Sequence, residues 1–569
     1  MSFLRVGPLV RAVTPDSVII WAEYWQAGEV TIRVLPMEAG AAISMRVHTV
    51  TVGGRHYVAP QLGGLQPATW YSYQIESRSD EDSLASARES TPLQQILSYQ
   101  CFRTLDAFDE EKQRDAQPLL IAYGSCRNLK ERGSDALSAF GPWLMEHFAE
   151  REKNWPRLLL LIGDQIYADE PSEDFLQRHP HLKKGAQTFA DFANMYEYAW
   201  TCDEQVRQVL AALPVYTIFD DHEIINNWDI APTWRVRALK HGKEQLLVDG
   251  LVAYWVYQGW GNVHERTGVV HPLLEIMQRA AESGEDALEA LRAAIVPDIR
   301  GNTHLKWHYE IPTRPPIFVM DARADRPTDF DSPQLFTEKP SRIISQGQME
   351  RIVSWLYENS EEPVIFASSV PVLLPPLIGW AEYVMGVRPL YNKAAPFHWL
   401  GRQLARIQYK LAIRTSFDHW PVFTETWKEL GDTLAQREQD VLVLSGDVHF
   451  SYAMEASSTK KSSKGAHLYQ LISTPFANKL DESSRKLVLG QARLKWASYG
   501  GLRMRMLPMY TAQQKRVPYD MLLQNVVAMV KIGRREDGGC EIGQEYLGVE
   551  DRGMEVVGKT VIKEAGNRP

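Results

Sequence analysis

The stretch VYTIFDDHEIINNWD, residues 215–229, places charged and amide side chains directly after a short apolar run. A buried strand normally ends in a turn of Gly, Asn or Asp rather than in a packed acidic cluster. Carboxylate, imidazole and amide groups are suitable ligands for hard or borderline cations such as iron, manganese, zinc or calcium. This stretch therefore predicts one wall of a metal site, with a solvated loop as the alternative interpretation.

Potential ligands also follow several other apolar runs. In chain order these residues are Cys126, then Asp164 and Tyr167, then Asp220, Asp221, His222, Asn226 and Asn227, then Asp321, Arg323 and Arg326, and finally Asp447 and His449. Each fragment alone is a weak signal, because Gly-Asp after a strand is common and a single histidine there is usually structural. The combination is stronger, since separate strand ends each supply an aspartate and two of them add a nearby histidine.

Such a ligand set suits the hydrolysis of a phosphate ester. Two cations about 3.5–4 Å apart can clamp a phosphoryl group and lower the pKa of a bound water. Asp164 follows the tight turn at Gly163 and is the natural carboxylate to bridge two cations. We therefore predict a metal-dependent phosphoric ester hydrolase that uses a metal-bound hydroxide.

The elements that must position these residues alternate between strands and helices from Pro118 onward. The expected strands are LLIAYGSC, RLLLLIGDQIY, VYTIFDDHE, PIFVMDARADR, PVIFASSVP and DVLVLSGDVHF, and helical patterns lie between them. This alternation is typical of an α/β layered core, in which ligands bind beyond the carboxyl ends of the strands. We expect residues 119–569 to form this catalytic domain, with helical insertions near 230–310 and 375–435 and edge strands from about residue 531.

Residues 1–104 differ from the rest, with short β-rich segments separated by Gly, Pro and Asp turns. Strands at this spacing predict a β-sandwich. Within it, LQPATWY at 65–71 looks like the L-x-P-x-T-x-Y signature of fibronectin type III domains, whose tyrosine hydroxyl ties a strand corner. We therefore expect a fibronectin III/Ig-like β-sandwich at 1–104, followed by a charged linker at 105–118.

Composition narrows the class of protein. The 569 residues exceed one ordinary core, and 44% hydrophobic with 23% charged residues lies in the range of soluble globular proteins. A net charge of −9 and a pI near 6.0 argue against a nucleic-acid-binding surface. They do not argue against a small phosphate-ester substrate, because a metal supplies local positive charge. The oligomeric state is left open.

The cysteines and the apolar segments bear on compartment and membrane. Four cysteines, Cys101, Cys126, Cys202 and Cys540, are scattered without a CxxC pair, which suggests a reducing compartment or no reliance on disulfides. The N-terminus shows no signal-peptide pattern, so we expect a cytoplasmic chain as numbered, or a secreted or periplasmic one if a leader was removed. The sequence has no run of 18 apolar residues, so we expect no transmembrane segment.

The motifs together resemble one enzyme family. GSC, GDQIYAD, FDDHEIINNW, FVMDAR and LSGDVHFS occur in the order and spacing of the alkaline phosphatase D (PhoD-like) family. That family belongs to the calcineurin-like, purple-acid-phosphatase-like metallophosphatases. The resemblance covers nearly the whole chain. It implies a four-layer αββα metallophosphatase sandwich after an N-terminal fibronectin- or Ig-like sandwich.

The resemblance also implies roles at a first metal. Cys126 would bind a ferric ion as a thiolate, Tyr167 as a phenolate and His449 through its imidazole. Asp164 would bridge that iron to a second metal. The alternatives are an ordinary buried cysteine at 126, since free cysteine is among the most buried residue types, and a core tyrosine at 167.

At the second metal, the resemblance makes Asp221 and Asp447 ligands, and Asp220, Asn226 or Asn227 would add oxygen ligands. Where many metallophosphatases have a histidine in a His-x-Pro strand end, this chain has SSVP at 368–371. The missing imidazole favours an oxygen-rich second site. We therefore expect Fe(3+) and Ca(2+), with Mn, Zn or Mg as alternatives for the second metal.

Catalysis and substrate binding are expected from further side chains. His222 would protonate the leaving oxygen or steady the phosphoryl transition state, and Asp164 would act with it through the metals. Arg127 and Arg323 are predicted to bind substrate, because arginine suits bidentate phosphate contact; structural ion pairs are the alternative. Tyr198 and its neighbouring aromatic residues are expected to pack rather than to form a substrate platform.

Phosphodiesters are the first choice of substrate and monoesters the second, by family resemblance alone. One alternative is a phospholipase-like phosphodiesterase, if the apolar segment at 370–387 lines the site and admits lipids. The other is a non-catalytic binding or adhesion protein on a metallophosphatase scaffold. Such a scaffold would have no use for the full ligand set.

Overall fold

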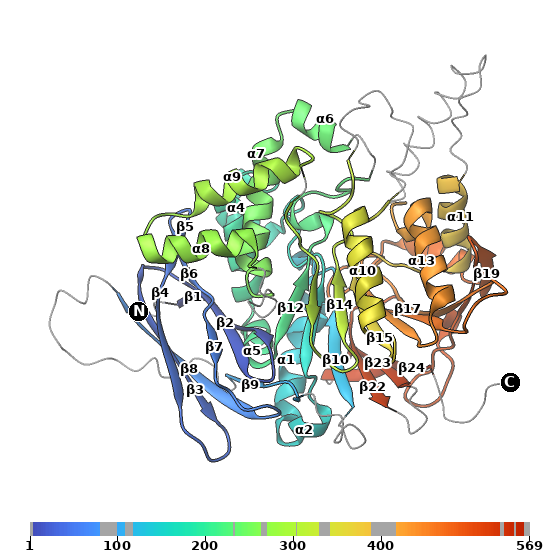
Figure 1. The fold of residues 1–569 in the computed structure, drawn as a ribbon, viewed down its shortest axis with the longest axis horizontal. Helices are drawn as coiled ribbons and strands as arrows, with labels where there is room; N and C mark the ends of the chain where they lie inside the picture. Colours follow the sequence, from blue (N-terminus) through green and yellow to red (C-terminus); the bar gives the residue numbers. More distant parts are fainter. Residues whose placement is uncertain are drawn as a thin grey trace.

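The computed structural model describes residues 4–79, 100–107, 118–230, 234–262, 270–302, 304–328, 342–387, 417–534, 540–550 and 553–562. The described strands form four sheets in a mixed α/β fold (Figure 1). Most of the predicted linker at 105–118 lies outside the described residues, as do residues 388–416 of the second predicted insertion. The division of the chain into domains at these boundaries stays a prediction.

Two antiparallel sheets make up the described part of residues 4–103. One contains β1 (Leu4–Val13), β2 (Ser17–Tyr24), β5 (Val50–Val52), β6 (Arg55–Val58) and β7 (Gln61–Gly63); the other contains β3 (Gly28–Pro36), β4 (Ile43–His48), β8 (Trp70–Ser79) and β9 (Cys101–Arg103). Ile20, Ile32 and Phe102 are buried in one cluster between them. The hydroxyl of Tyr71 accepts the backbone N–H of Gln66 at 2.8 Å, which is the expected tie at this corner.

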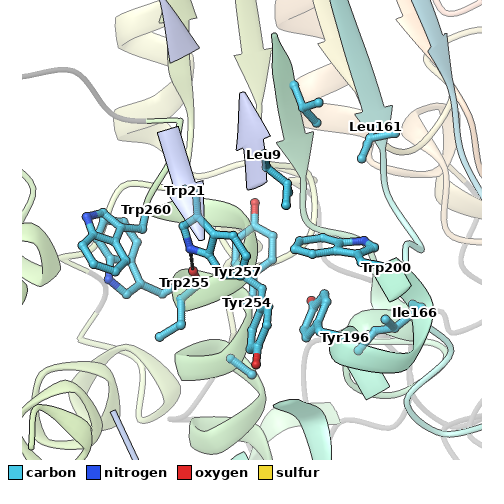
Figure 2. Packing of buried hydrophobic residues seen from close by; sticks show 14 of the residues in the cluster. Leu9, Trp21, Leu161, Ile166, Tyr196, Trp200, Tyr254, Trp255, Tyr257 and Trp260 are labelled. Carbon is cyan, nitrogen blue, oxygen red and sulfur yellow. Dashed lines mark hydrogen bonds between the residues drawn. The ribbon is translucent and has the colours of Figure 1, made fainter. Parts of the chain in front are cut away.

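An aromatic cluster joins the first sheet to the helices that follow (Figure 2). The indole Nε1 of Trp21 donates to the carbonyl of Val256 at 2.9 Å, and the Trp21 and Tyr257 rings lie 5.5 Å apart. Val256 and Tyr257 belong to η6 (Trp255–Gly259), a π-helical turn that continues α7 (Glu244–Tyr254). Strand β2 is therefore anchored on a turn of irregular backbone, a kind that is frequent at functional sites.

The six-stranded sheet has the order β12-β11-β10-β22-β23-β24. Its strands are β10 (Leu119–Gly124), β11 (Leu158–Ile162), β12 (Val215–Ile218), β22 (Val526–Arg534), β23 (Cys540–Glu550) and β24 (Gly553–Val561). β10, β11 and β12 run parallel and are almost entirely buried, as expected for strands covered on both faces. Of the edge strands expected from about residue 531, β24 does lie at the edge of this sheet, whereas β22 and β23 each pair on both sides.

The nine-stranded sheet has the order β13-β14-β15-β16-β18-β17-β20-β19, with β21 beside β17. Its strands are β13 (Tyr309–Ile311), β14 (Ile317–Met320), β15 (Val364–Ser368), β16 (Val441–Ser445), β17 (Ser451–Ser458), β18 (His467–Ile472), β19 (Trp496–Tyr499), β20 (Leu502–Met506) and β21 (Met521–Leu522). The neighbours β14, β15, β16 and β18 are parallel, so their carboxyl ends share one edge.

The two large sheets share one apolar core. Leu160 and Ile218 of the six-stranded sheet belong to the same buried cluster as Val319 and Leu444 of the nine-stranded sheet. Helices α1 (Ala136–Glu146), α4 (Phe189–Thr201) and α5 (Glu204–Ala212) contribute to a second cluster, and α10 (Gln346–Glu358) and α13 (Thr424–Gln436) to a third. Figure 1 shows α10 and α13 beside the strands of the nine-stranded sheet.

The remaining described α-helices are α2 (Arg151–Asn154), α3 (Glu173–Arg178), α6 (Trp234–Lys240), α8 (Pro272–Ser283), α9 (Leu288–Ile299), α11 (Pro376–Val387) and α14 (Glu482–Gln491). The region near 230–310 thus contains α6 to α9, and the region near 375–435 contains α11 and α13. Within the described ranges, none of the helices has the length and apolar character needed to cross a membrane.

Candidate metal centre

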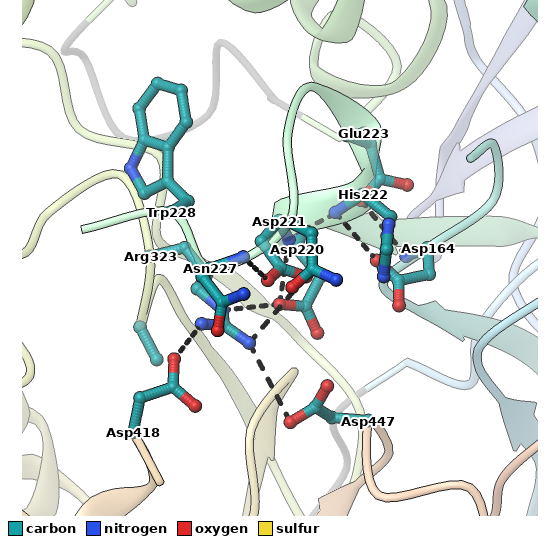
Figure 3. A network of polar contacts seen from close by, with 12 residues as sticks. Asp164, Asp220, Asp221, His222, Glu223, Asn227, Trp228, Arg323, Asp418 and Asp447 are labelled. Carbon is teal, nitrogen blue, oxygen red and sulfur yellow. Dashed lines mark hydrogen bonds and ion pairs between the residues drawn. The ribbon is translucent and has the colours of Figure 1, made fainter. Parts of the chain in front are cut away.

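Parallel strands of both large sheets end at the same place and deliver most of the predicted ligands there. Cys126 follows β10, Asp164 follows β11 and Asp221 follows β12, all in the six-stranded sheet. Asp447 follows β16 of the nine-stranded sheet. Figure 3 shows the side chains of Asp164, Asp220, Asp221 and Asp447 gathered around a common space.

A first group surrounds one oxygen of Asp164. Its Oδ2 lies 3.6 Å from Sγ of Cys126 and 3.4 Å from Oη of Tyr167. The side-chain amide of Asn478 donates to Oη of Tyr167 at 2.8 Å and to Nε2 of His449 at 3.2 Å. The structure therefore brings together the four residues that were predicted to hold the first metal, with Asn478 between two of them.

The acidic side chains form two further sets with metal-ligand spacing. In one, ligand atoms of Asp164, Asp221 and His222 all lie within 4.8 Å of one another; in the other, those of Asp164, Asp220 and Asp447 do. Asp164 is common to both sets, which is the arrangement of a bridging carboxylate. The protein therefore has acidic and histidine groups positioned to bind metal ions.

The chemistry of the donors fits a hard cation. Oδ2 of Asp220 is buried and has no hydrogen-bond partner among the described residues, although a buried carboxylate oxygen normally has one. A cation next to Asp164 and Asp447 would satisfy this oxygen. Burial raises the pKa of Asp164 and of Asp220 well above the usual range, and neighbouring carboxylates add to the rise. Burial also raises the pKa of the Cys126 thiol. A bound cation reverses such shifts.

The backbone has positive φ at five of the predicted ligand positions. Cys126, Asp164, Asn227, Asp447 and His449 have φ values of 57°, 55°, 62°, 68° and 59°. Positive φ is uncommon outside glycine and costs free energy that the surrounding structure must supply. Such residues cluster at functional sites, so these five positions support the location of the site independently of side-chain chemistry.

Glu223 holds the loops that carry the carboxylates. Its Oε2 accepts the backbone N–H groups of Asp164 at 3.0 Å and of Asp220 at 2.8 Å, and its Oε1 accepts that of Gln165 at 2.7 Å. Gly163 allows this close approach, because a Cβ there would lie 2.5 Å from Cβ of Asp220. The sequence reading gave Glu223 no separate role.

Arg323 lies inside the acidic cluster. Its Nε pairs with Oδ1 of Asp220, its Nη1 pairs with Asp418, and its Nη2 lies 3.7 Å from Oδ2 of Asp447. The neighbouring loop is held by Asp321, whose Oδ1 accepts the backbone N–H of Arg323 at 3.0 Å. The guanidinium of Arg323 is thus directed at carboxylates, and its predicted contact with substrate stays a prediction.

Arg127 and Asn227 each have defined hydrogen-bond partners. Nε of Arg127 pairs with Oδ2 of Asp135 at 2.8 Å, and its Nη1 donates to the carbonyl of Ala199 at 2.6 Å. The backbone N–H of Asn227 donates to Oδ2 of Asp221 at 2.6 Å, which fixes the loop that carries that carboxylate. The ligand role predicted for Asn227 stays a prediction.

His222 has a defined orientation. Its Nδ1 donates to Oδ1 of Asp169 at 2.8 Å, and its ring stacks on that of Tyr167 with centroids 4.2 Å apart. Although burial alone would lower it, the pKa of His222 is raised well above its usual value by Asp169 and by the carboxylates of Asp164 and Asp221. The imidazole is therefore held in one position beside the acidic cluster.

A second histidine contacts the cluster from the region near 375–435. Nε2 of His419 lies 3.1 Å from Oδ2 of Asp447, and its Nδ1 lies 2.7 Å from Oε1 of Glu382. Burial lowers the pKa of His419, but Glu382 and Asp447 together raise it to about 10. His419 thus bridges Glu382 and Asp447 and holds the Asp447 side chain in position.

Several of these supporting residues were missed by the sequence reading. Asp169 is the last residue of the motif GDQIYAD, so the motif itself could have identified it as a residue of the site. Asp418 and His419 form an Asp-His pair in FDHW that repeats part of FDDHE, which was a second signal. Glu382 and Asn478 stand in segments without a comparable pattern.

One segment of the chain matches a known protein family. Residues 121–261, which include Cys126, Asp164, Tyr167 and His222, match the family model of PhoD-like phosphatases. The matched segment belongs to the PhoD-like phosphatase family. This confirms the family predicted from the motifs, and the PhoD-like segment spans β10, β11, β12 and the loops that follow them.

Two further comparisons extend beyond the PhoD-like segment. Residues 1–96 match a model described as a domain of unknown function, DUF7800. A solved structure of PhoD superposes with a TM-score of 0.53 and 13% sequence identity, over 98% of this chain and 92% of that one, so the two share a fold. The search of curated proteins gave no significant match.

Proposed function

We propose that this protein is a metal-dependent phosphohydrolase that prefers phosphodiesters to phosphomonoesters. The observation that carries the proposal is the pair of ligand sets that share Asp164. When bound there, two cations would supply Lewis acidity and a nucleophilic water at neutral pH. The membership of residues 121–261 in the PhoD-like phosphatases supports the same reaction class.

His222 is the proposed general acid. With Nδ1 engaged by Asp169, Nε2 is the nitrogen that can hold a proton for the departing ester oxygen. A positioned acid of this kind contributes roughly 10²–10⁴-fold to a rate. Asp169 fixes the ring, so it is a positioning residue rather than a catalytic one.

The proposed metals are Fe(3+) beside Cys126, Tyr167 and His449 and Ca(2+) beside the remaining carboxylates. A thiolate and a phenolate at the first position suit a ferric ion, whereas the oxygen donors of Asp220, Asp221 and Asp447 suit calcium. Mn, Zn and Mg are the alternatives at the second position. Asp164 would contact both ions.

The charge of the site supports the preference for diesters. Four carboxylates meet there, and Arg323 is already paired with two of them. A phosphomonoester carries a second negative charge near neutral pH, so it meets stronger repulsion than a singly charged diester. Bound metals reduce this repulsion for both kinds of ester.

The test is the initial rate of hydrolysis of bis-p-nitrophenyl phosphate by the metal-loaded wild type and by Asp164→Asn. We expect turnover in the wild type and a loss of several hundredfold or more in the variant, equivalent to about 4 kcal/mol at roughly tenfold per 1.36 kcal/mol. Full turnover and full metal content in the variant would refute the proposal. Glu482→Asn, an exposed position on α14, is the matched control.

A lipid phosphodiester is the second candidate substrate. Leu377 and Trp380 on α11 are 44% and 50% exposed, and Trp496 on the adjacent strand β19 is 64% exposed. Large exposed apolar side chains close together are typical of surfaces that meet lipid. Release of headgroups from phospholipid vesicles by the wild type, reduced in Trp380→Ser, would support this candidate; release from soluble diesters alone would remove it.

We also propose the finer architecture. The shared core of the two large sheets, with helices in the two other clusters, supports a four-layer αββα sandwich. The two small sheets and the Tyr71 corner support a fibronectin III/Ig-like sandwich at 1–104, a linker at 105–118 and a catalytic domain at 119–569. Limited proteolysis that cuts first at 105–118 would agree with these boundaries, and initial cleavage within 119–230 would not.

A further inference from the structure

Helix α11 carries a buried carboxylate that has no part in the proposed reaction. Glu382 is the one charged residue in its sequence PLIGWAEYVMGV, and the residue is fully buried. Its Oε2 has no hydrogen-bond partner among the described residues. Burying a carboxylate costs free energy, and apolar residues in place of a buried ion pair are often equally or more stabilising. Packing of α11 alone therefore does not account for Glu382.

Close packing of α11 brings Glu382 to His419. The helix lies against η8 (Trp420–Val422), a short 3-10 helix that begins directly after His419. Gly386 allows this approach, because a Cβ there would clash with the carbonyl oxygen of Val422. Nδ1 of His419 lies 2.7 Å from Oε1 of Glu382, so the carboxylate fixes the rotation of the imidazole ring.

The other nitrogen of the His419 ring faces the metal centre. Its Nε2 lies 3.1 Å from Oδ2 of Asp447. Nη2 of Arg323 is 3.7 Å from the same oxygen, which is beyond hydrogen-bond distance. Among the described residues, His419 belongs to neither of the two sets with metal-ligand spacing. It therefore acts on a bound cation through Asp447 rather than as a ligand.

Asp447 serves one of the two proposed cation positions. Its carboxylate has metal-ligand spacing with Asp164 and Asp220, the set assigned to the second cation. The ferric ion is proposed to lie beside other donors, among them Cys126 and Tyr167. A residue that orients Asp447 should therefore affect the two positions unequally.

We propose that His419 and Glu382 are positioning residues for Asp447, and that they set the affinity of the second cation position but not of the first. The proposal rests on the proposed function, because it presupposes two cation positions. It gives the region near 375–435, expected from the sequence as a helical insertion, a part in building the metal centre.

The experiment measures cation binding rather than turnover. Calcium is titrated by calorimetry into iron-loaded protein that has been depleted of divalent cations, and manganese is titrated in the same way. Elemental analysis measures the iron that each protein retains. In the wild type we expect one of these divalent cations to bind and the iron to remain in place.

Two substitutions at His419 each keep one of its hydrogen bonds. The amide nitrogen of His419→Gln reaches as far as Nε2 and can donate to Asp447, whereas that of His419→Asn reaches only as far as Nδ1 and can donate to Glu382. His419→Asn should lower the affinity for the second cation roughly 10–100-fold, and His419→Gln should retain most of it. Both variants should keep their iron. A role of His419 only in holding α11 predicts the opposite order of affinities.

A double variant separates positioning from stability. Glu382→Met with His419→Phe replaces the whole buried pair by apolar side chains, so the free energy of unfolding without divalent cations should stay the same or rise. The affinity for the second cation should still fall as in His419→Asn. The control is His467→Asn, because His467 makes a similar pair with Glu455 at 2.6 Å, at the start of β18 and away from the centre.

Wild-type affinity for the second cation in His419→Asn would overturn the proposal. So would the opposite order of the asparagine and glutamine variants, or a parallel loss of iron and of the second cation. Failure of calcium and manganese to bind the wild type would also overturn it. Failure of the proposed function is distinguishable, because it appears as absence of bis-p-nitrophenyl phosphate turnover in wild-type protein with both cations bound.

Discussion

The side-chain amide of Gln258 donates from Nε2 to Oε1 of Glu223, 3.1 Å away. Gln258 lies in the π-helical turn η6. Its backbone carbonyl accepts a hydrogen bond from Nη2 of Arg11, a residue of β1. Because Glu223 holds the backbone of Asp164 and Asp220, a continuous set of hydrogen bonds runs from the first strand of the chain to the metal centre. The N-terminal sheet is therefore part of the support of the site.

Glu223→Gln should weaken metal binding. An amide at this position presents an NH₂ group to N–H donors, so one of the loops that carry Asp164 and Asp220 loses its acceptor. Loss of a residue that orients ligands typically costs roughly 10–100-fold in metal affinity. Chelator competition measures this constant, with Glu482→Gln as the exposed control. Unchanged affinity would show that the loops hold their positions without Glu223.

Metal addition should stabilise the protein after chelator treatment. Asp164 and Asp220 are buried next to each other, and a bound cation removes their repulsion. A ligand at 100 times its dissociation constant stabilises by about 2.7 kcal/mol. Denaturant titration with and without added metal measures this gain. In Asp164→Asn most of the gain should vanish, because the shared ligand is lost; an equal gain in both proteins would place the metal elsewhere.

His271 should make stability fall in mild acid. Its Nε2 donates to the carbonyl of Lys306 and its Nδ1 accepts the backbone N–H of Leu273, so the neutral imidazole fits this site. Burial lowers the pKa of His271 from 6.5 to about 4. The unfolded chain thus binds the proton more readily, and stability is lost as pH falls from 6.5 toward 4, by about 2 kcal/mol at pH 5.

The check on His271 is urea unfolding of the wild type and of His271→Asn at pH 7.5 and pH 5. Asparagine can still cap the helix that begins at Pro272, but it does not titrate. The variant should lose about 2 kcal/mol less between the two pH values. An identical pH dependence in both proteins would assign the acid sensitivity to other groups.

Tyr71→Phe should lower the free energy of unfolding of the N-terminal sheets. The substitution removes the acceptor of the Gln66 N–H at 2.8 Å, in a tyrosine that is 1% exposed. Losing such a bond costs roughly 1–3 kcal/mol. Thermal or denaturant unfolding measures the loss. Tyr357→Phe, at an 83% exposed site, should be neutral, and equal effects from both substitutions would contradict the role of this corner.

The candidate ligands that follow apolar runs were evident in the sequence. Cys126, Asp164, Asp221 and Asp447 each follow shortly after a strand that is almost entirely buried, and parallel strands end at a common edge. The short runs LLLLI and VLVLS are each followed by Gly-Asp, so the place where each strand ends is evident. This is why the place of the site was predictable.

The residues that support the ligands were less predictable. Glu382 lies on helix α11, and Asp418 and His419 do not directly follow any described strand, so the pattern of ligands after strands does not mark these three residues. The ion pairs of Arg323 depend on loops from three separate parts of the chain. The position of β22 also depends on pairing with β10, which local sequence does not specify.

The pairing of β22 with β10 has a consequence for synthesis of the chain. Tyr123 on β10 donates its hydroxyl to Gln544 on β23, and 421 residues separate the two. At roughly 5–20 residues per second, a ribosome needs about 20–80 seconds to cover that distance. Throughout this interval one edge of β10 lacks its neighbour, and open edges invite pairing with other chains. The nascent protein must therefore be kept from aggregating before its sheet can close.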